Sequence, residues 1–248
     1  MIHLKSPREI EAMRKAARLA DRARRLAGEM VSPGVTTAEI DREVRRLIEA
    51  DGARPAFLGY RGFPASVCIS VNEAVIHGIP GGRKLLRGDI VSIDVGTLLD
   101  GFFGDCAATF AAGGASTEAM RLIEVTRQSF YDGLALCRVG YRLSDVSHAI
   151  QAHAEGQGFS VVRDFVGHGI GKALHESPEV PNYGEPGRGI RLQAGMTLAI
   201  EPMINAGGPA VRVLDDDWTV VTADGNLSAH YENTVLITDG APEILSSV

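Results

Sequence analysis

The chain has 248 residues, of which 45% are hydrophobic and 23% are charged, with a formal net charge of −6. This composition is typical of a globular protein with one large domain or two fused halves, and the negative charge argues against a nucleic-acid-binding or membrane-surface role. The three cysteines form no C-x-x-C pair and exclude a disulfide framework. The chain has no apolar signal core and no apolar run of about 18 residues, which excludes a membrane span, so we expect a cytoplasmic protein.

Two amphipathic helices are predicted first. The helix in residues 6–30 begins with Ser6 as N-cap, Pro7 at its first position and Glu9 to close a capping box. A second helix in residues 36–52 begins with a capping box of the same kind. The spacing of apolar residues in both segments predicts one buried helical face.

Runs with the pattern of buried strands follow, and two more helices are predicted near residues 116–137 and 144–156. The predicted strands are ASVCISVN (65–72), DIVSIDVG (89–96), GFFGDCAATF (101–110), GMTLAIEPMI (195–204), DWTVVTADG (217–225) and HYENTVLITD (230–239).

The order of two helices followed by strands occurs twice, which indicates an internal duplication within one catalytic domain, with halves of roughly 1–113 and 114–248. Glycines, apolar residues and carboxylates match between the halves. The matched pairs include Gly34 with Gly140, Ile40 with Val146, Gly88 with Gly195, Asp94 with Glu201, and Asp105 with Glu232.

Two aspartates lie within predicted buried strands, where an unpaired carboxylate costs several kcal/mol. Asp100-Gly101 is a favoured two-residue hairpin turn. With this turn, Gly96 is opposite Asp105, and alternation of side chains places Asp94 and Asp105 on one face as diagonal neighbours. The adjacent Cys106 then faces the other way and is not a ligand.

A cation between the carboxylates would remove their repulsion. The duplication predicts a second carboxylate pair, Glu201 and Glu232, and His168 in the glycine-rich turn GHGIG offers a neutral nitrogen. Taken singly, each residue is more simply a turn, edge or core residue. As a set, they predict two divalent cations, and this donor set suits Mn, Fe, Co or Zn. Such a pair typically supports hydrolysis.

Five separated motifs resemble those of the type I methionine aminopeptidases of the short bacterial kind, in peptidase family M24. They are VNEAVIHGIP, SIDVGTLLDGFFGDCAATF, GHGIGKALHE, AIEPMI and YENTVLIT. The resemblance covers essentially the whole chain. It implies the α+β pita-bread fold, in which two related halves with curved antiparallel sheets enclose a dimetal site. It also implies removal of the initiator methionine from nascent proteins when the second residue is small and uncharged.

The resemblance also implies roles for individual residues. Asp94 would bind one metal, His168 and Glu201 the other, and Asp105 and Glu232 would bridge the two. Glu201 would shuttle a proton, and His77 and His175 would contact the substrate and stabilise the tetrahedral intermediate. A site for a monovalent cation, Na or K, would include Asn72, Ala74 and Ser228.

The same resemblance predicts a pocket for the methionine side chain, lined by Tyr60, Phe63, Cys68 and Trp218. Aromatic walls suit a thioether, because sulfur–aromatic contacts add to apolar burial. Two residues depart from the family pattern: Leu174 is at a position where phenylalanine is usual, and Phe57 is where cysteine is common. We therefore expect a pocket of altered shape.

Three alternatives remain. A general metal-binding module is disfavoured by the paired histidines His77 and His175, and the other two are proteins with this fold. A proline-specific peptidase usually has an additional N-terminal domain, which we do not expect here, and a non-enzymatic binding protein typically lacks metal ligands. The expected partners are nascent polypeptide N-termini, with contact at the ribosome left open, and the expected state is a monomer. Neither a zinc-finger extension nor a separate ribosome-docking module is expected.

Overall fold

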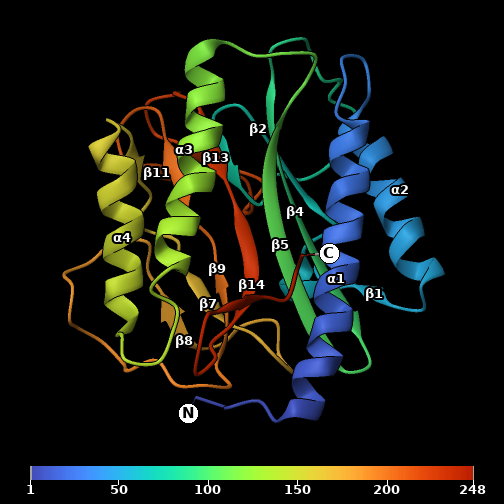
Figure 1. Cartoon of the computed structure of the whole chain (residues 1–248). Coiled ribbons are helices and arrows are strands. Elements are labelled where there is room, and N and C mark those ends of the chain that lie inside the picture. Colours follow the sequence, from blue (N-terminus) through green and yellow to red (C-terminus); the bar gives the residue numbers. More distant parts are fainter. Residues whose placement is uncertain (1, 248) are drawn as a thin grey trace.

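The computed structural model describes residues 2–247, and its helices lie on one side of a large antiparallel sheet (Figure 1). The helices are α1 (Pro7–Met30), α2 (Thr37–Ala50), α3 (Thr117–Leu134) and α4 (Leu143–Gly156). The long strands are β4 (Ile90–Leu99) and β5 (Phe102–Ala111). The short strands are β1 (Arg54–Pro55), β2 (Cys68–Val71), β3 (Ala74–Ile76), β6 (Ser160–Val161), β7 (Gly167–Gly169), β8 (Glu176–Val180), β9 (Thr197–Ile200), β10 (Met203–Asn205), β11 (Val211–Val213), β12 (Val220–Thr222), β13 (Ser228–His230), β14 (Glu232–Leu236) and β15 (Glu243–Ile244).

Both predicted capping boxes are confirmed. The Ser6 hydroxyl accepts the Glu9 N–H, and the Glu9 carboxylate accepts the Ser6 N–H at 2.9 Å. Thr36 and Glu39 make the same reciprocal pair at the start of α2. These bonds satisfy backbone donors that have no partner within the helix, so the local sequence determines where each helix begins.

The hairpin β4–β5 has the predicted turn and register. Asp100 and Gly101 have φ values of 52° and 80°, which is the conformation that a type I′ turn requires of its two central residues. Gly96 pairs with Asp105. This tight turn fixes the pairing of both long strands and therefore the face on which each side chain lies.

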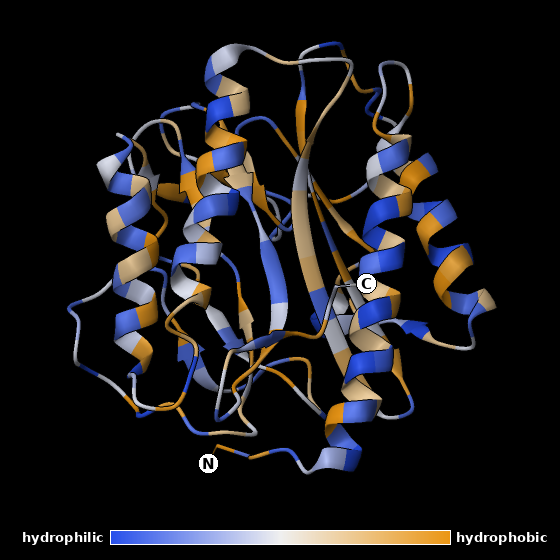
Figure 2. Ribbon diagram, viewed as in Figure 1, coloured by the Kyte–Doolittle hydropathy of each residue, from blue (hydrophilic) through white to orange (hydrophobic). Residues whose placement is uncertain are grey.

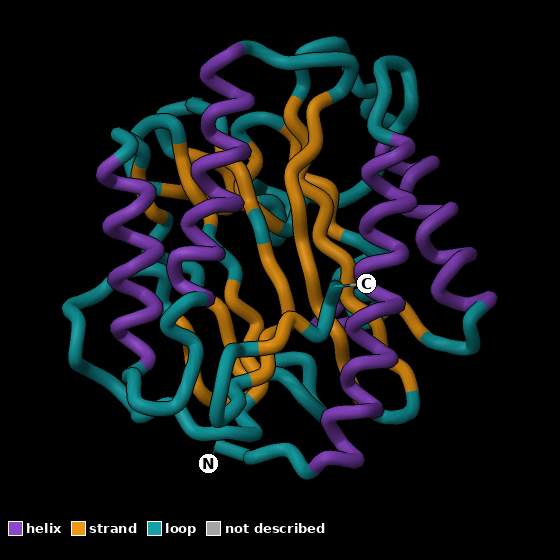
Figure 3. The backbone as a smooth tube through the Cα atoms, in the orientation of Figure 1, coloured by secondary structure: helices purple, strands orange, loops and turns teal. Residues whose placement is uncertain are grey.

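Strands that are far apart in the sequence are neighbours in the sheet. The order β1-β4-β5-β14-β9-β7-β8 places β14 between β5 and β9, and all of these pairs are antiparallel. In the same sheet, β2 also pairs with β4, and β15 also pairs with β14. Two smaller three-stranded sheets have the orders β13-β10-β6 and β11-β12-β3. Figure 3 shows the strands gathered behind the helices.

The core lies between the helices and the sheet. Figure 2 shows hydrophobic and hydrophilic stripes along the helices, as expected for helices that bury one face. Gly104 on β5 permits the close approach of α1, since a Cβ at this position would lie 2.4 Å from the backbone of Ala17. Helix α1 therefore covers the face of β5 that is opposite to Asp105. Among the helices of the described residues, none is long and apolar enough to cross a bilayer.

Matching backbone features occur in the two halves of the chain. Gly34 and Gly140 precede α2 and α4, and both have a positive φ. The backbone bond from Leu85 N–H to the Val35 carbonyl has a counterpart from Leu192 N–H to the Tyr141 carbonyl. The corresponding segments of the two halves therefore have similar local conformations.

Several predicted strands are shorter than expected: 65–72 contains only β2, and 230–239 contains β14 and the last residue of β13. The predicted strand 195–204 is divided into β9 and β10 at Glu201-Pro202, because Pro202 has no N–H to donate and β10 pairs within a different sheet. The predicted strand 217–225 contains only β12, because the Asp216 carboxylate accepts backbone N–H groups in the turn before it.

Candidate active site

The two aspartates of the hairpin face a cavity on the side of the sheet away from α1. The cavity has a volume of about 140 Å³. Its walls consist of aromatic and apolar side chains and of a group of carboxylates and imidazoles. The lining residues are Phe57, Tyr60, Arg61, Phe63, Cys68, His77, Asp94, Asp105, His168, Leu174, His175, Glu201, Trp218 and Glu232. The structure thus brings together every residue predicted for the two metals, for catalysis and for the pocket.

Neighbouring strands supply the remaining acidic groups. Glu232 begins β14 and pairs with Ala107 of β5, so its side chain lies beside that of Asp105. Glu201 follows the end of β9, and its carboxylate is 3.6 Å from Nε2 of His168. Asp105, His168 and Glu232 each offer a ligand atom, and these atoms lie within 4.8 Å of one another.

His168 is on the short strand β7 and not in a turn, contrary to the sequence interpretation. Its backbone pairs with both β8 and β9, which leaves little freedom for the residue. The ring Nδ1 donates to the Gly169 carbonyl at 2.9 Å. The lone pair of Nε2 is therefore directed at the carboxylates, as for an imidazole that is held ready to bind a metal.

Several buried polar atoms of this cluster have no hydrogen-bond partner within residues 2–247. They are Oδ1 of Asp94, Oδ1 of Asp105, Oε1 of Glu232 and Nε2 of His230. A buried unsatisfied polar group costs about 1–3 kcal/mol, and more if it is charged. A divalent cation is the partner that suits convergent carboxylate oxygens and imidazole nitrogen, so the residues fit such a group.

The electrostatics agree with this donor set. Burial raises the pKa of Asp94 to about 7, and burial with the charges of Glu232 and Asp94 raises the pKa of Asp105 well above its ordinary range. Burial also lowers the pKa of His168 and of His77 to about 4, so both imidazoles are neutral at pH 7. Neutral imidazoles can bind metal or donate one hydrogen bond.

Without a bound cation, the free energy of unfolding is expected to fall between pH 6.5 and pH 8. The carboxylates have higher pKa values in the folded chain than in the unfolded chain, so the folded state holds more protons here and stability decreases as pH rises. The buried histidines have lowered pKa values, so they make stability increase as pH rises, but only below their ordinary pKa of 6.5. Each pKa unit corresponds to about 1.4 kcal/mol.

Urea unfolding of chelator-treated protein at pH 6.5, 7.2 and 8 measures how steeply the free energy of unfolding falls with pH. Asp105→Asn is expected to reduce it, because one of the mutually repelling groups no longer ionises. A metal-free protein whose stability rises across this interval would contradict the picture of repelling carboxylates.

Aromatic rings form the other end of the cavity. Phe63 and Trp218 are in edge-to-face contact with ring centroids 5.1 Å apart, and His77 is edge-on to Trp218 at 6.2 Å. Leu174 is buried in the same apolar cluster as Phe57. These contacts give a closed apolar compartment directly beside the acidic cluster.

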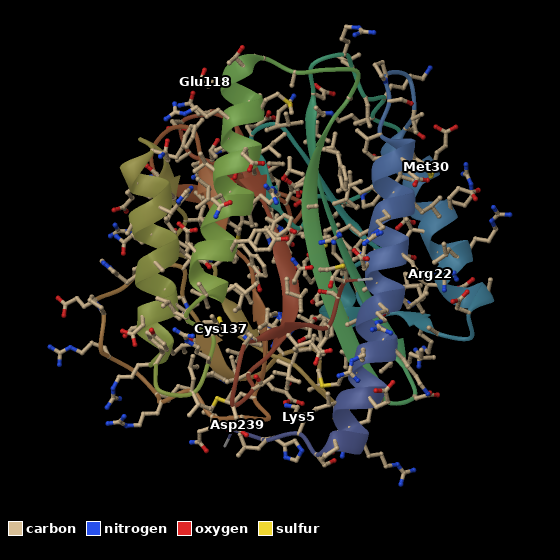
Figure 4. The ribbon with its side chains drawn as sticks, viewed as in Figure 1. Lys5, Arg22, Met30, Glu118, Cys137 and Asp239 are labelled. Carbon is tan, nitrogen blue, oxygen red and sulfur yellow. The ribbon has the colours of Figure 1, made fainter. Side chains whose placement is uncertain are left out.

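The loop that carries Leu174 and His175 is fastened by a buried ion pair. Lys5, labelled in Figure 4, donates to Oε2 of Glu176 at 2.6 Å, and its side chain is 2% exposed. The other oxygen of Glu176 accepts the backbone N–H groups of Lys172 and Ala173. The segment before α1 therefore holds this loop against the cavity.

The structure adds two residues to the predicted site. His230, at the end of β13, is buried, and its Nε2 lies 3.8 Å from Glu201 and 4.0 Å from Glu232. Arg61 lines the cavity from a short turn. Neither residue belongs to the motifs that led to the other ligands. The only available signal for His230 is its place two residues before Glu232 in a strand-like run.

The residues predicted for a monovalent cation lie together but outside the cavity lining. Asn72 is between β2 and β3, and its carbonyl accepts the Ser228 N–H at 2.9 Å. Ala74 begins β3, which is in contact with β13.

Cys106 is buried on the opposite face, as predicted, and it lies near the guanidinium of Arg24.

Comparisons with known proteins agree with this site. Residues 11–239 match the family model described as metallopeptidase family M24. The chain is 56% identical over 248 residues to "Methionine aminopeptidase" of Clostridium perfringens, with all of both chains covered. It matches the methionine aminopeptidase structure from Rickettsia prowazekii with a TM-score of 0.98, 40% identity and full coverage of both chains.

A more distant likeness concerns the fold alone. The prolidase from Pyrococcus furiosus has a TM-score of 0.79 and 24% identity, over 99% of this chain and 65% of that chain. Together with the closer matches, it confirms the predicted α+β pita-bread fold. The chain therefore belongs to metallopeptidase family M24 and, within that family, to the methionine aminopeptidases.

Proposed function

We propose that this chain is a metal-dependent aminopeptidase that hydrolyses the first peptide bond of proteins beginning with methionine. The observation that carries the proposal is the cavity in which buried carboxylates with unpartnered oxygens lie beside a closed aromatic compartment. The acidic cluster suits a metal centre, and the compartment suits one apolar side chain. The family of the chain supports both assignments.

The carboxylates and His168 would hold two divalent metal ions. Asp94 would hold one ion, His168 and Glu201 would hold the other, and Asp105 and Glu232 would be shared between them. Ions held by these residues would supply an activated water and a positive charge for the peptide carbonyl. Glu201 takes the proton of the attacking water on its carboxylate and delivers it to the leaving amine.

His77 and His175 contact the reacting peptide and stabilise the negative charge that develops on its carbonyl oxygen. The Tyr60 hydroxyl is 2.9 Å from Nδ1 of His175, and when it donates there, the Nε2–H of His175 is available to the substrate. His77 has a φ of 58°, a strained conformation for a residue with a side chain. Strain of this kind is concentrated at functional sites.

The compartment beside the metal site receives the methionine side chain. Tyr60, Phe63, Cys68 and Trp218 surround it, and Leu174 and Phe57 shape its inner wall. A bulky second side chain would collide with the wall that carries His77. Excess bulk is rejected by steric overlap, so the second residue is Gly, Ala, Ser, Thr, Cys, Pro or Val.

The remaining assignments extend this proposal. The metals are two ions of Co, Mn, Fe or Zn, and Asn72, Ala74 and Ser228 bind Na or K. The protein acts as a monomer in the cytoplasm on nascent polypeptide N-termini, at the ribosome or after release. The chain is a single catalytic domain of two related halves, roughly 1–113 and 114–248, and the matching backbone bonds described above support this division.

A panel of three peptides tests the proposal. Met-Ala-Ser is expected to be cleaved with a kcat/KM at least about 10-fold above that of Leu-Ala-Ser. Leucine is branched and shorter than methionine, and a misfit of about one methylene in an apolar pocket already changes discrimination by about 10- to 200-fold. Met-Lys-Ser is expected to be poor for steric reasons. The assay uses chelated protein to which Mn or Co is returned, and Leu174→Phe shows whether an aromatic wall sharpens the choice.

Three results would contradict parts of this proposal. Equal kcat/KM for the three peptides indicates a broad aminopeptidase of the same fold. Preference for Xaa-Pro peptides indicates a proline-specific peptidase. A protein without bound metal or activity indicates a binding function.

A further inference from the structure

Arg61, which the proposed mechanism does not use, is placed at the mouth of the cavity by a short turn. The turn, Tyr60–Gly62, precedes Phe63 at the inner end of the aromatic compartment. Arg61 itself is exposed, yet it lines the cavity together with Tyr60 and His175. Its charge therefore lies between bulk solvent and the reacting groups.

The backbone holds Arg61 in an unusual conformation. Its φ is 49°, in the left-handed region that a residue with a side chain seldom adopts. The turn is closed by backbone bonds from Gly62 N–H to the Gly59 carbonyl and from Gly59 N–H to the Phe63 carbonyl. The side chain is thus directed by a firmly bonded turn, and strain of this kind is concentrated at functional sites.

The guanidinium has aromatic and imidazole neighbours and no acidic partner. Its carbon lies 5.5 Å from the centre of the Tyr60 ring, and Tyr60 is stacked on His175 with centroids 5.3 Å apart. The ion pairs within residues 2–247 do not include Arg61. Its positive charge adds to the desolvation that lowers the pKa of His175, so its field extends to a group that contacts the reacting peptide.

The difference in exposure between the inner and outer residues of the cavity indicates how a peptide substrate lies in it. The inner residues Phe63, Cys68 and Leu174 are at most 4% exposed, whereas Arg61 and His175 are exposed. With the first side chain in the inner compartment, the rest of the peptide can leave only through the mouth. The residues after the second therefore pass beside the guanidinium.

We propose that Arg61 is a specificity residue that favours substrates with acidic side chains at the third and fourth positions over substrates with basic ones. The inference rests on the proposed function. An exposed ion pair changes affinity modestly, so the expected preference is about 2- to 5-fold for each charge, and it decreases with added salt. The contact is electrostatic and not a requirement for hydrolysis.

The test compares Met-Ala-Asp-Asp-Ser with Met-Ala-Lys-Lys-Ser in low and high salt. The ratio of their kcat/KM values is expected to exceed one in the unaltered protein, to approach one in Arg61→Gly and to invert in Arg61→Glu. Glycine suits the positive φ at this position, so that variant removes the charge without backbone strain. Arg18→Glu is the matched control, because Arg18 is exposed on α1, on the other side of the sheet.

A second readout does not depend on metal or turnover. Trp218 is the single tryptophan of the chain and lines the cavity, so its fluorescence reports peptide binding to chelated protein. The ratio of the two peptide affinities is expected to shift toward the lysine peptide in Arg61→Glu and to stay unchanged in Arg18→Glu.

The outcomes separate this inference from the proposed function. If Met-Ala-Ser is cleaved and the peptide ratios are the same in Arg61→Glu as in the unaltered protein, Arg61 has no role in selection. If Arg18→Glu shifts the ratios as much as Arg61→Glu, only net charge matters, and the inference is also wrong. If Met-Ala-Ser is not cleaved at all, the proposed function fails, and the fluorescence ratios still decide the role of Arg61.

Discussion

Replacing Asp105 by Asn, or Glu232 by Gln, is expected to lower kcat/KM by more than about 100-fold and to reduce the bound metal. Loss of a residue that only supports a metal ligand already costs about 10- to 100-fold, and each of these carboxylates is proposed to bridge both ions. Stability responds in the opposite sense in the metal-free protein. Its free energy of unfolding is expected to stay constant or to rise, because one buried repelling charge has been removed.

Three measurements on the same preparations check this prediction: turnover, metal content and urea unfolding after chelation. Glu118→Gln, an exposed change at the start of α3, serves as the matched control (Figure 4). Near-normal turnover together with near-normal metal content in Asp105→Asn would exclude the bridging role.

The His175→Ala variant is expected to keep its metal and to lose about 100- to 1,000-fold in kcat, the usual cost of removing one group that stabilises a developing oxyanion. Its KM should change less, since the contact is strongest in the transition state. The ring stands between Tyr60 and His168, with its centroid 4.1 Å from that of His168, so it is close to the proposed ligands without being one of them.

Steady-state kinetics and metal analysis together decide this second case. His148→Ala, an exposed histidine on α4, is the comparison variant, and both its kcat and its metal content should match those of the unaltered protein. Loss of bound metal from His175→Ala would show that the side chain belongs to the metal centre.

Local sequence determines a large part of this structure. The Asp100-Gly101 turn alone specifies the pairing of β4 with β5, and the pairing specifies which face carries Asp94 and Asp105. The helix starts follow in the same way from Ser6 and Thr36, since each cap is completed within three residues. Short-range patterns of this kind can be read without knowledge of the rest of the chain.

Other features depend on contacts between distant segments and could not be predicted in this way. β14 lies between β9 and β5, and β5 is more than 100 residues away from it in the sequence, so no local pattern encodes that order. His230 acquires its unpartnered Nε2 only through this arrangement. The conformation of Arg61 similarly depends on the bonds that close its turn. The resemblance to a known family supplied what spacing alone could not.

The junction of β5 with β14 has a consequence for the cohesion of the molecule. Only two residue pairs are in register there, and Arg24, from the opposite face, donates to the carbonyls of Ala107 and Glu232. The acidic cluster spans this narrow junction, with Asp105 on one strand and Glu232 on the other. Ions bound between them would cross-link the N-terminal and C-terminal parts of the chain. Metal binding and the resistance of the two parts to separation would then be linked in one equilibrium. In a cell short of metal, the enzyme would be inactive and would also open more readily to proteases.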